Sequence, residues 1–269
     1  MNDPETYSHN NQPQKIRVEA FFKNYGEDLK KEFDGKEIDL LDIGVGCGKI
    51  LNEVIIAQSG LKFSNIVAVD VNEDMLKYSI ENYGSEPISF EVLDAGKELP
   101  DNFKNRKFDL ITSFFCIHWI NDFNVLFENI RNLLKPNGIF CCIFFQVKRS
   151  VAKNLEEADD AVRNLVQYEN RPNFRIEGDP SEVVRGHLSD NNMEVVHMTY
   201  GDDAFIFEDL DAIKGFSDPL APNLANLPDE EKLSAFGTLT ELFEMEFEDD
   251  KLVFGLRTVT FMAKKLADD

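Results

Sequence analysis

Basic side chains are scarce in this chain of 269 residues: 28 lysines and arginines stand against 50 aspartates and glutamates, and the net charge is −22. Proteins that bind a phosphate backbone need lysine and arginine to displace its counterions, so no nucleic-acid partner is expected. The sequence also lacks any apolar run long enough to span a membrane. Residues 1–5 have neither the basic nor the apolar region of a signal peptide, and we expect a cytoplasmic protein without stable membrane insertion.

Cysteine is also rare. Four cysteines are present, and no two of them have the C-x-x-C spacing typical of metal and redox sites. Cys141 and Cys142 are adjacent, so their side chains would point to opposite faces of a strand. We therefore expect reduced thiols and no metal.

The first half of the chain alternates strand and helix patterns. Strands are expected at residues 38–43, 65–71, 88–93, 108–114 and, after a turn at 135–138, 139–145. Helices are expected at residues 16–33, 49–58, 73–83 and 123–134. Short crossovers of this kind predict an α/β fold with a doubly wound parallel sheet, whose ligand lies beyond the carboxyl ends of the strands.

Beyond residue 146 the alternation is lost. Further helices are expected at 151–168, 180–191, 209–216 and 229–247, and strands at 194–200 and 253–264. The last of these strands is expected to enter the sheet as an antiparallel partner. No internal repeat or low-complexity linker separates these parts, so the sequence predicts one domain over residues 1–269.

A motif of the form D-x-G-x-G-x-G begins at Asp42 and places Gly44, Gly46 and Gly48 between an apolar strand and a helix. Without Cβ atoms, glycines permit a tight turn and let the backbone approach a ligand. The spacing differs from the G-x-G-x-x-G of dinucleotide enzymes, and an acid before the glycines suits a cationic ligand better than a phosphate. The alternative is an ordinary glycine-rich turn from strand to helix.

Two further acids end the next two strands. Asp70 is placed to accept hydrogen bonds from both ribose hydroxyls of a nucleoside. Asp94 could accept one from an adenine amino group, with the Ala95 N–H donating to the ring and Val71 and Met75 flanking it. For a single acid at a strand end, a helix cap or a solvated loop is the competing explanation.

Together these positions resemble the class I S-adenosyl-L-methionine-dependent methyltransferases, whose cofactor carries a sulfonium and an ammonium group but no phosphate. The resemblance implies a Rossmann-like, seven-stranded sheet with its last strand antiparallel, helical cap insertions, and S-adenosyl-L-methionine as the cofactor, released as S-adenosyl-L-homocysteine. The cofactor-binding residues that it implies are Tyr7, Asp42, Gly44, Gly46, Asp70, Val71, Met75, Asp94, Ala95 and Ser113.

A second group of residues follows the fourth strand, where His118 stands beside Trp119, the only tryptophan in the chain. A tryptophan at a strand end is more often a core residue, and a histidine beside it is usually structural. The polar segment 7–14 would lie over the cofactor in this fold, although its composition alone favours a disordered tail.

A narrower resemblance, over nearly the whole chain, is to the juvenile hormone acid methyltransferases, which methylate the carboxyl group of farnesoic acid and its epoxide. It is carried by the motif and strand ends above, by the spacing of Tyr7, Asn11 and Gln14, and by the stretches 114–122, 207–213 and 259–266. It implies a role in juvenile hormone biosynthesis.

The same resemblance, shared with the plant carboxyl methyltransferases of salicylate and jasmonate, implies the acceptor site. Gln14 and Trp119 would hold the acceptor carboxylate, and His118 would lie beside it. The stretch 147–175 differs from the insect family, so the identity of the acid stays open.

The expected chemistry fits these residue types. A carboxylate with a pKa of about 4 to 5 is ionised at neutral pH, so its attack on the methyl carbon needs no general base. Neutral N–H donors can orient it without the ground-state stabilisation that an arginine would add. The apolar residues expected to line the acceptor pocket are Phe21, Phe115, Phe174 and Phe216. For each of them the alternative is a core position.

The sequence thus predicts a methyltransferase that esterifies the carboxylate of a small lipophilic acid. The competing hypotheses are transfer to another acceptor class, such as an amine or a phenol, and a non-catalytic paralogue that binds the cofactor or a lipid. The expected parts are an N-terminal lid with its leading helix at 1–35, a cofactor-binding core at 36–146, cap insertions at 147–178 and 208–250, and the rest of the sheet domain at 179–207 and 251–269.

Overall fold

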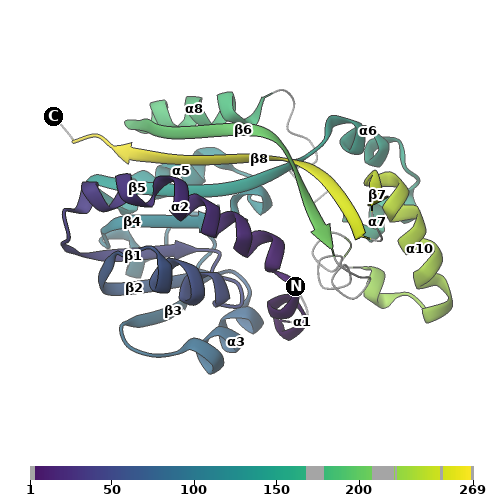
Figure 1. Cartoon of the computed structure of the whole chain (residues 1–269), viewed down its shortest axis with the longest axis horizontal. Helices are drawn as coiled ribbons and strands as arrows, with labels where there is room; N and C mark the ends of the chain where they lie inside the picture. The colour runs from purple at the N-terminus through teal and green to yellow at the C-terminus, as the bar shows by residue number, and fades with distance from the viewer. Residues whose placement is uncertain (1–3, 168–178, 208–220, 222, 249–250, 268–269) are drawn as a thin grey trace.

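The computed structural model describes residues 4–167, 179–207, 221, 223–248 and 251–267. Its core is a mixed β-sheet with the strand order β3-β2-β1-β4-β5-β8-β6, and the short β7 pairs with β8 (Figure 1). The strands are β1 (Glu37–Ile43), β2 (Lys62–Asp70), β3 (Ile88–Val92), β4 (Phe108–Phe114), β5 (Leu134–Val147), β6 (Met193–Phe207), β7 (Met245–Glu248) and β8 (Lys251–Lys265). The helices are α1 (Pro4–Asn10), α2 (Gln12–Phe33), the π-helical η1 (Leu51–Ile56), α3 (Glu73–Tyr83), α4 (Asp101–Lys104), the 3-10 turn η2 (Ile117–Trp119), α5 (Phe123–Leu133), α6 (Arg149–Glu157), α7 (Asp160–Leu165), α8 (Pro180–Asp190), the 3-10 turn η5 (Leu224–Asn226) and α10 (Asp229–Leu242).

The first five strands pair in parallel, which confirms the predicted α/β class. Helices cover both faces of this sheet. Leu29 of α2 and Leu51 of η1 pack in one apolar cluster, whereas Phe127 of α5 and Leu188 of α8 pack in the other. Because helices cover both faces, nearly every residue of β1 and β4 is buried, the polar Asp42, Thr112 and Ser113 included.

Strand β8 lies between β5 and β6 and runs antiparallel to both. Phe261 pairs with Cys142 of β5 on one side and with Met198 of β6 on the other. This confirms the predicted antiparallel partner. The helix predicted at 73–83 and the strand predicted at 108–114 have the bounds of α3 and β4, and the segment 49–58 is helical throughout.

The predicted helices of the cap were wrong in extent. The one expected at 151–168 is two helices, because Asp159 caps a new start by accepting a hydrogen bond of 2.9 Å from the Val162 N–H. The one expected at 229–247 ends at Leu242 and gives way to β7, after Glu244 adopts a left-handed φ of 51°. The helix expected at 209–216 lies outside the described residues.

Strands β5 and β6 are each about twice as long as predicted. The strand expected at 194–200 extends to Phe207, because β8 supplies hydrogen-bonding partners along its whole length. The turn expected at 135–138 lies within β5, where the register against β4 shifts and Asn137 has a left-handed φ of 61°. The length of such a strand depends on a partner that is distant in the sequence, so it cannot be predicted from the local pattern of apolar residues.

The N-terminal segment is helical and docked. Helix α1 ends at Asn10, and the Lys49 Nζ of the glycine loop donates a hydrogen bond of 2.9 Å to the Ser8 carbonyl. Helix α2 is fixed to β6 by Arg17, whose Nε lies 2.6 Å from Asp203 Oδ2. Figure 1 shows α1 at the same end of the sheet as α6, α7 and α10. The disordered-tail alternative is therefore wrong for the part of this segment that the structure describes.

Across these described ranges, no helix combines the length and apolarity needed to cross a bilayer. Within the same ranges, no three acidic, histidine or cysteine side chains converge as metal ligands would.

Candidate active site

A pocket of about 490 Å³ opens at the carboxyl ends of the parallel strands, within the range of small-molecule and cofactor sites. The loops after β1, β2, β3 and β4 form most of its wall, and the α1–α2 junction covers part of it. The predicted site residues on this wall are Tyr7, Asp42, Gly44, Gly46, Asp70, Val71, Met75, Asp94, Ala95, Phe115 and Trp119.

The glycine loop is shaped by a steric requirement at Gly44. This residue has a φ of +79°, and a Cβ atom there would lie 2.3 Å from Cys116 Sγ. Its N–H donates a hydrogen bond of 2.8 Å to the Val69 carbonyl. Only glycine combines this left-handed conformation with so close an approach between the loops after β1 and β4.

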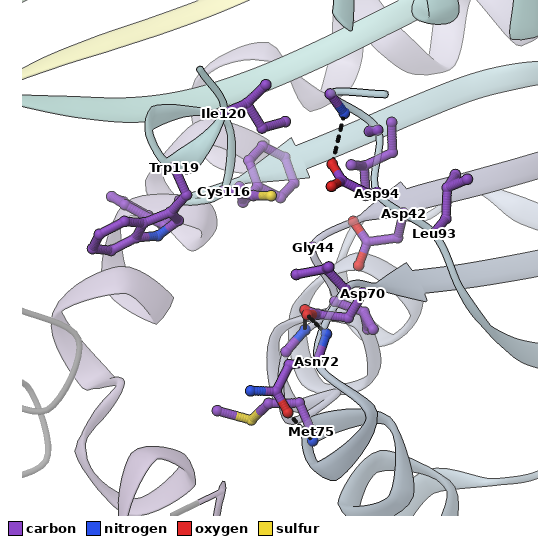
Figure 2. Close-up of a pocket in the computed structure, with 18 of the residues that line it drawn as sticks. Asp42, Gly44, Asp70, Asn72, Met75, Leu93, Asp94, Cys116, Trp119 and Ile120 are labelled. Atoms are coloured by element: carbon purple, nitrogen blue, oxygen red, sulfur yellow. Dashed lines mark hydrogen bonds between the residues drawn. The ribbon is translucent and has the colours of Figure 1, made fainter. Parts of the chain in front are cut away.

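Asp70 connects the glycine loop to the end of β2. Its two carboxylate oxygens accept hydrogen bonds from the backbone N–H groups of Gly46 and Asn72, each at 2.9 Å (Figure 2). Burial raises the pKa of Asp70, and these N–H donors oppose that rise. Each carboxylate oxygen has about two lone-pair sites, so the carboxylate is held in place with acceptor capacity left for a ligand.

Asp42 is buried at the floor of the pocket and is 5% exposed. Burial raises its pKa to about 7, the charge of Asp70 adds to the rise, and a hydrogen bond of 2.6 Å from the Thr112 hydroxyl opposes it. A cationic ligand beside Asp42 would favour the ionised carboxylate.

Asp94 both lines the pocket and organises its own turn. It accepts a hydrogen bond of 3.0 Å from the Gly96 N–H and pairs with Lys97 at 2.9 Å. Asp94 can therefore bind a ligand in the pocket and also stabilise its loop, so the two explanations considered for this acid are compatible. Met75 and Val71, the two residues predicted to flank an adenine, differ in solvent exposure: Met75 is buried and Val71 is 64% exposed.

The part of the wall that follows β4 carries the neutral side chains of Phe115, Cys116 and Trp119, and Asp122 lies further along the same loop. Figure 2 shows Trp119 across the pocket from Asp70 and Asn72. Phe115, just before Cys116, has a strained left-handed φ of 58°, a feature that clusters at functional sites. Burial, with the nearby Asp70 carboxylate, raises the pKa of the Cys116 thiol to about 12.

The hydroxyl of Tyr7 is neutral for the same reason. Burial, followed by the proximity of Cys47 and Asp70, raises its pKa. Neither the Tyr7 phenol nor the Cys116 thiol is therefore an ionised base at neutral pH.

Four predicted residues are not on the pocket wall. Gln14 is buried in the first turn of α2, and its Oε1 has no hydrogen-bond partner among the described residues. His118 lies behind Trp119, with ring centroids 4.8 Å apart, and Ser113 donates a hydrogen bond of 3.0 Å to the Ile43 carbonyl. Phe21 is a core residue, packed 5.5 Å from Phe114 between ring centroids.

Phe174 and Phe216 lie outside the described residues. The pocket also contains residues that the sequence did not mark as site residues. These are Asn11, Cys47, Ile120, Lys97 and Gln167, among others. Asn11 belongs to the N-terminal spacing that carried the resemblance, and this signal could have identified it; no sequence signal marked Gln167.

Comparison with known proteins agrees with this geometry. A family of methyltransferase domains matches residues 41–142, which hold the glycine loop and all three strand-end acids. Residues 41–142 are thus a methyltransferase domain of the class I fold, with S-adenosyl-L-methionine as the cofactor.

The curated relatives of this methyltransferase include two insect enzymes. It is 28% identical to juvenile hormone acid O-methyltransferase of Drosophila melanogaster, over 85% of this chain and 78% of that protein. It is 26% identical to the enzyme of the same name from Bombyx mori, over 80% of this chain and 77% of that protein. Phosphoethanolamine N-methyltransferase 2 of Haemonchus contortus, in complex with S-adenosyl-L-methionine, has the same fold, with a TM-score of 0.51 and 19% identity over 90% of this chain and 52% of that one.

Proposed function

We propose that this methyltransferase esterifies the carboxylate of a small lipophilic acid, producing a methyl ester and S-adenosyl-L-homocysteine. The observation that carries the proposal is the row of neutral side chains, Phe115, Cys116 and Trp119, on the pocket wall after β4. An acceptor that is already ionised at neutral pH can react there, whereas a phenol or an alkylammonium would first have to lose a proton to a base. The names of the two insect relatives support the same acceptor class, with juvenile hormone biosynthesis as its setting. The cytoplasmic location stays a prediction.

The aspartate side of the pocket suits the cofactor. Asp70 would accept from the ribose hydroxyls, and Asp94 and Ala95 would bind the adenine edge between Val71 and Met75. Asp42 would lie at the amino-acid end, where an ammonium group suits a buried acid. When bound, S-adenosyl-L-methionine supplies an electrophilic methyl group. Tyr7 and the α1–α2 junction would cover it from solvent.

The acceptor carboxylate would be oriented by neutral donors. Trp119 is on the pocket wall with its indole N–H, and Gln14 is buried in the first turn of α2, whose N-cap residue Asn11 is also on the wall. Such donors fix an oxygen near the methyl carbon without the added stabilisation of the anion that a cation would give before reaction. His118 would act through Trp119 as a positioning residue, because its ring is held between Trp119 and Phe145.

The acceptor's chain would meet apolar side chains. Phe115 on the wall packs against Phe205 of β6, with ring centroids 5.9 Å apart. Phe205 in turn belongs to the apolar cluster that includes Leu239 and Phe243 of the cap. This continuity favours a lipophilic acid over a short polar one.

Trp119→Phe tests the proposal directly. The change keeps an aromatic ring and removes the N–H, so kcat for methylation of farnesoic acid is expected to fall roughly tenfold to a hundredfold, since a hydrogen bond to a charged group contributes about 1.5–3 kcal/mol. The dissociation constant of S-adenosyl-L-methionine is expected to stay within about twofold. The assay measures radiolabelled methyl ester, identified by release of methanol in base.

Tyr200→Phe is the matched control, because it also removes a polar group from an aromatic side chain; this hydroxyl lies on β6, accepts a hydrogen bond from Arg257 and does not line the pocket. Its kcat should equal that of the wild type. Transfer to phenols or amines, with none to any acid in the panel, would refute the proposed function.

Salt dependence gives a second test. With a net charge of −22, the protein repels an anionic acid and attracts a cofactor that carries one net positive charge. Raising the salt concentration from about 20 to 200 mM screens both interactions. We expect kcat/KM to rise for the acid and to fall for S-adenosyl-L-methionine, each by roughly twofold or more. Changes of the same sign for both substrates would contradict an anionic acceptor.

A further inference from the structure

Gln167 is the one residue of the described cap that reaches the pocket. Every other residue on the pocket wall lies between Tyr7 and Asp122, whereas Gln167 follows the end of α7. It belongs to the segment after β5, and β5 neighbours β4 in the sheet. Gln167 thus shares the pocket wall with Phe115 and Trp119 but comes from the cap, whereas the aspartates come from the strands of the sheet and the loops that follow them.

The backbone at Gln167 is strained. Its φ is +50°, in the left-handed region that disfavours residues with a Cβ atom. Its N–H donates a hydrogen bond of 3.2 Å to the Asn164 carbonyl, which closes the last turn of α7. Strain of this kind persists where the surrounding structure fixes the residue, and such positions cluster at ligand sites.

The side chain of Gln167 is aimed by a second part of the cap. Its Nε2 lies 3.5 Å from Asn223 Oδ1, and Asn223 is itself fixed because its Nδ2 donates a hydrogen bond of 2.7 Å to the Asn164 carbonyl. The Gln167 amide therefore joins the two cap segments at the pocket. A primary amide carries two N–H donors, and Asn223 can take only one of them in this arrangement.

We propose that Gln167 is a specificity-determining residue that donates its other N–H to the acceptor acid from the cap side. This inference rests on the proposed function, and it assigns recognition of the acceptor, but not of the cofactor, to the cap. As a neutral donor, Gln167 adds a hydrogen bond to the carboxylate without placing a positive charge beside the sulfonium.

Two variants at this position test the assignment. Gln167→Gly removes the amide while accommodating the left-handed backbone, so the melting temperature should not fall by more than about 2 °C. Its KM for farnesoic acid is expected to rise about tenfold or more, with the dissociation constant of S-adenosyl-L-methionine unchanged within about twofold. Gln167→Glu keeps the shape but opposes an anion, and should raise the KM further.

Asn192→Gly is the matched control, since Asn192 also has a left-handed φ, of 54°, but lies between α8 and β6 and does not line the pocket. It should leave both substrates' constants unchanged. An unchanged KM for farnesoic acid in Gln167→Gly would overturn the assignment, as would an equal loss of affinity for the cofactor.

Binding separates this inference from the proposed function. Quenching of Trp119 fluorescence by farnesoic acid and by dodecanoic acid, with S-adenosyl-L-homocysteine bound, reports acceptor affinity without turnover. Acids that bind the wild type, weaken in Gln167→Gly and are never methylated would refute the proposed function and support the role of Gln167. Acids that neither bind nor react would overturn both.

Discussion

The Asp42→Asn variant is expected to bind S-adenosyl-L-methionine roughly a hundredfold more weakly than the wild type and yet to be more stable without it at pH 8. The loss of affinity follows from removing the buried carboxylate proposed to face the cofactor's ammonium. The gain in stability follows from removing the cost of ionising a carboxyl group that is 5% exposed. An asparagine Oδ1 can still accept the Thr112 hydrogen bond.

The sign of the pH dependence follows from the raised pKa of about 7 in the unliganded protein. A raised carboxyl pKa stabilises the fold below the unfolded value of about 4. That contribution is lost as the pH rises through 7. At pH 8, Asp42→Asn should therefore raise the free energy of unfolding by roughly 2–4 kcal/mol relative to the wild type, a difference that disappears below about pH 4.

The affinity for the cofactor should increase with pH, whereas the stability contributed by Asp42 decreases. Below pH 7 the wild type must lose the Asp42 proton to bind the cation, so its dissociation constant should rise up to about tenfold for each unit of pH. Calorimetry in buffers of different ionisation enthalpy should detect proton release on binding near pH 7, and none in Asp42→Asn. Asp94→Asn is the control: it weakens the cofactor site without a stability gain, because Asp94 is about a third exposed and paired with Lys97. A flat affinity profile between pH 5.5 and about 8 would contradict this role for Asp42.

The Gly44→Ala variant is expected to lose roughly 3–5 kcal/mol of stability and all measurable cofactor binding. Two costs add here. The new Cβ would meet Cys116 Sγ at 2.3 Å and Cys116 Cβ at 2.4 Å, and alanine would be held at a φ of +79°. Relief requires the loops after β1 and β4 to separate, which widens the cofactor cradle. Chemical denaturation and cofactor titration measure the two effects.

Gly35→Ala is the matched control for the backbone cost, since Gly35 has a φ of +70° and no atom within 4 Å of its added Cβ. It should cost only about 1–2 kcal/mol. Combining Gly44→Ala with Cys116→Gly removes the clash but not the strain. The two substitutions together should therefore destabilise the protein by about 1 kcal/mol or more less than the sum of their separate effects. Separate effects that simply add would contradict the steric explanation.

The cofactor side of the site was predictable because it is encoded locally. A carboxylate such as Asp70 reaches the pocket by ending a parallel strand, and the order of strand and helix is written in the spacing of apolar residues. Gly44 is likewise required by a turn between adjacent elements. Asp42, Asp70 and Trp119 were therefore correctly predicted to share one pocket, because the carboxyl ends of parallel strands lie at the same edge of the sheet.

The acceptor side was less predictable because it depends on packing between distant segments. Phe21 is a large apolar residue of the kind that lines pockets, but it packs against Phe114 in the core. The apolar periodicity of its helix is the same for a core position and for a pocket position. Gln167 lines the pocket at the end of α7, where it contacts Asn223, 56 residues later in the chain. The split of the cap helices at Asp159 likewise reflects a local hydrogen bond that outweighs a continuous apolar pattern.

The position of β8 imposes an order on biosynthesis. This strand emerges from the ribosome after β5 and β6, yet it is the one that joins them. Until it is translated, the facing edges of both neighbours present unpaired backbone groups, which are templates for association with other chains. A nascent chain stalled before residue 251 would thus hold a formed cofactor cradle beside an unclosed sheet, and chaperone demand should peak at that stage.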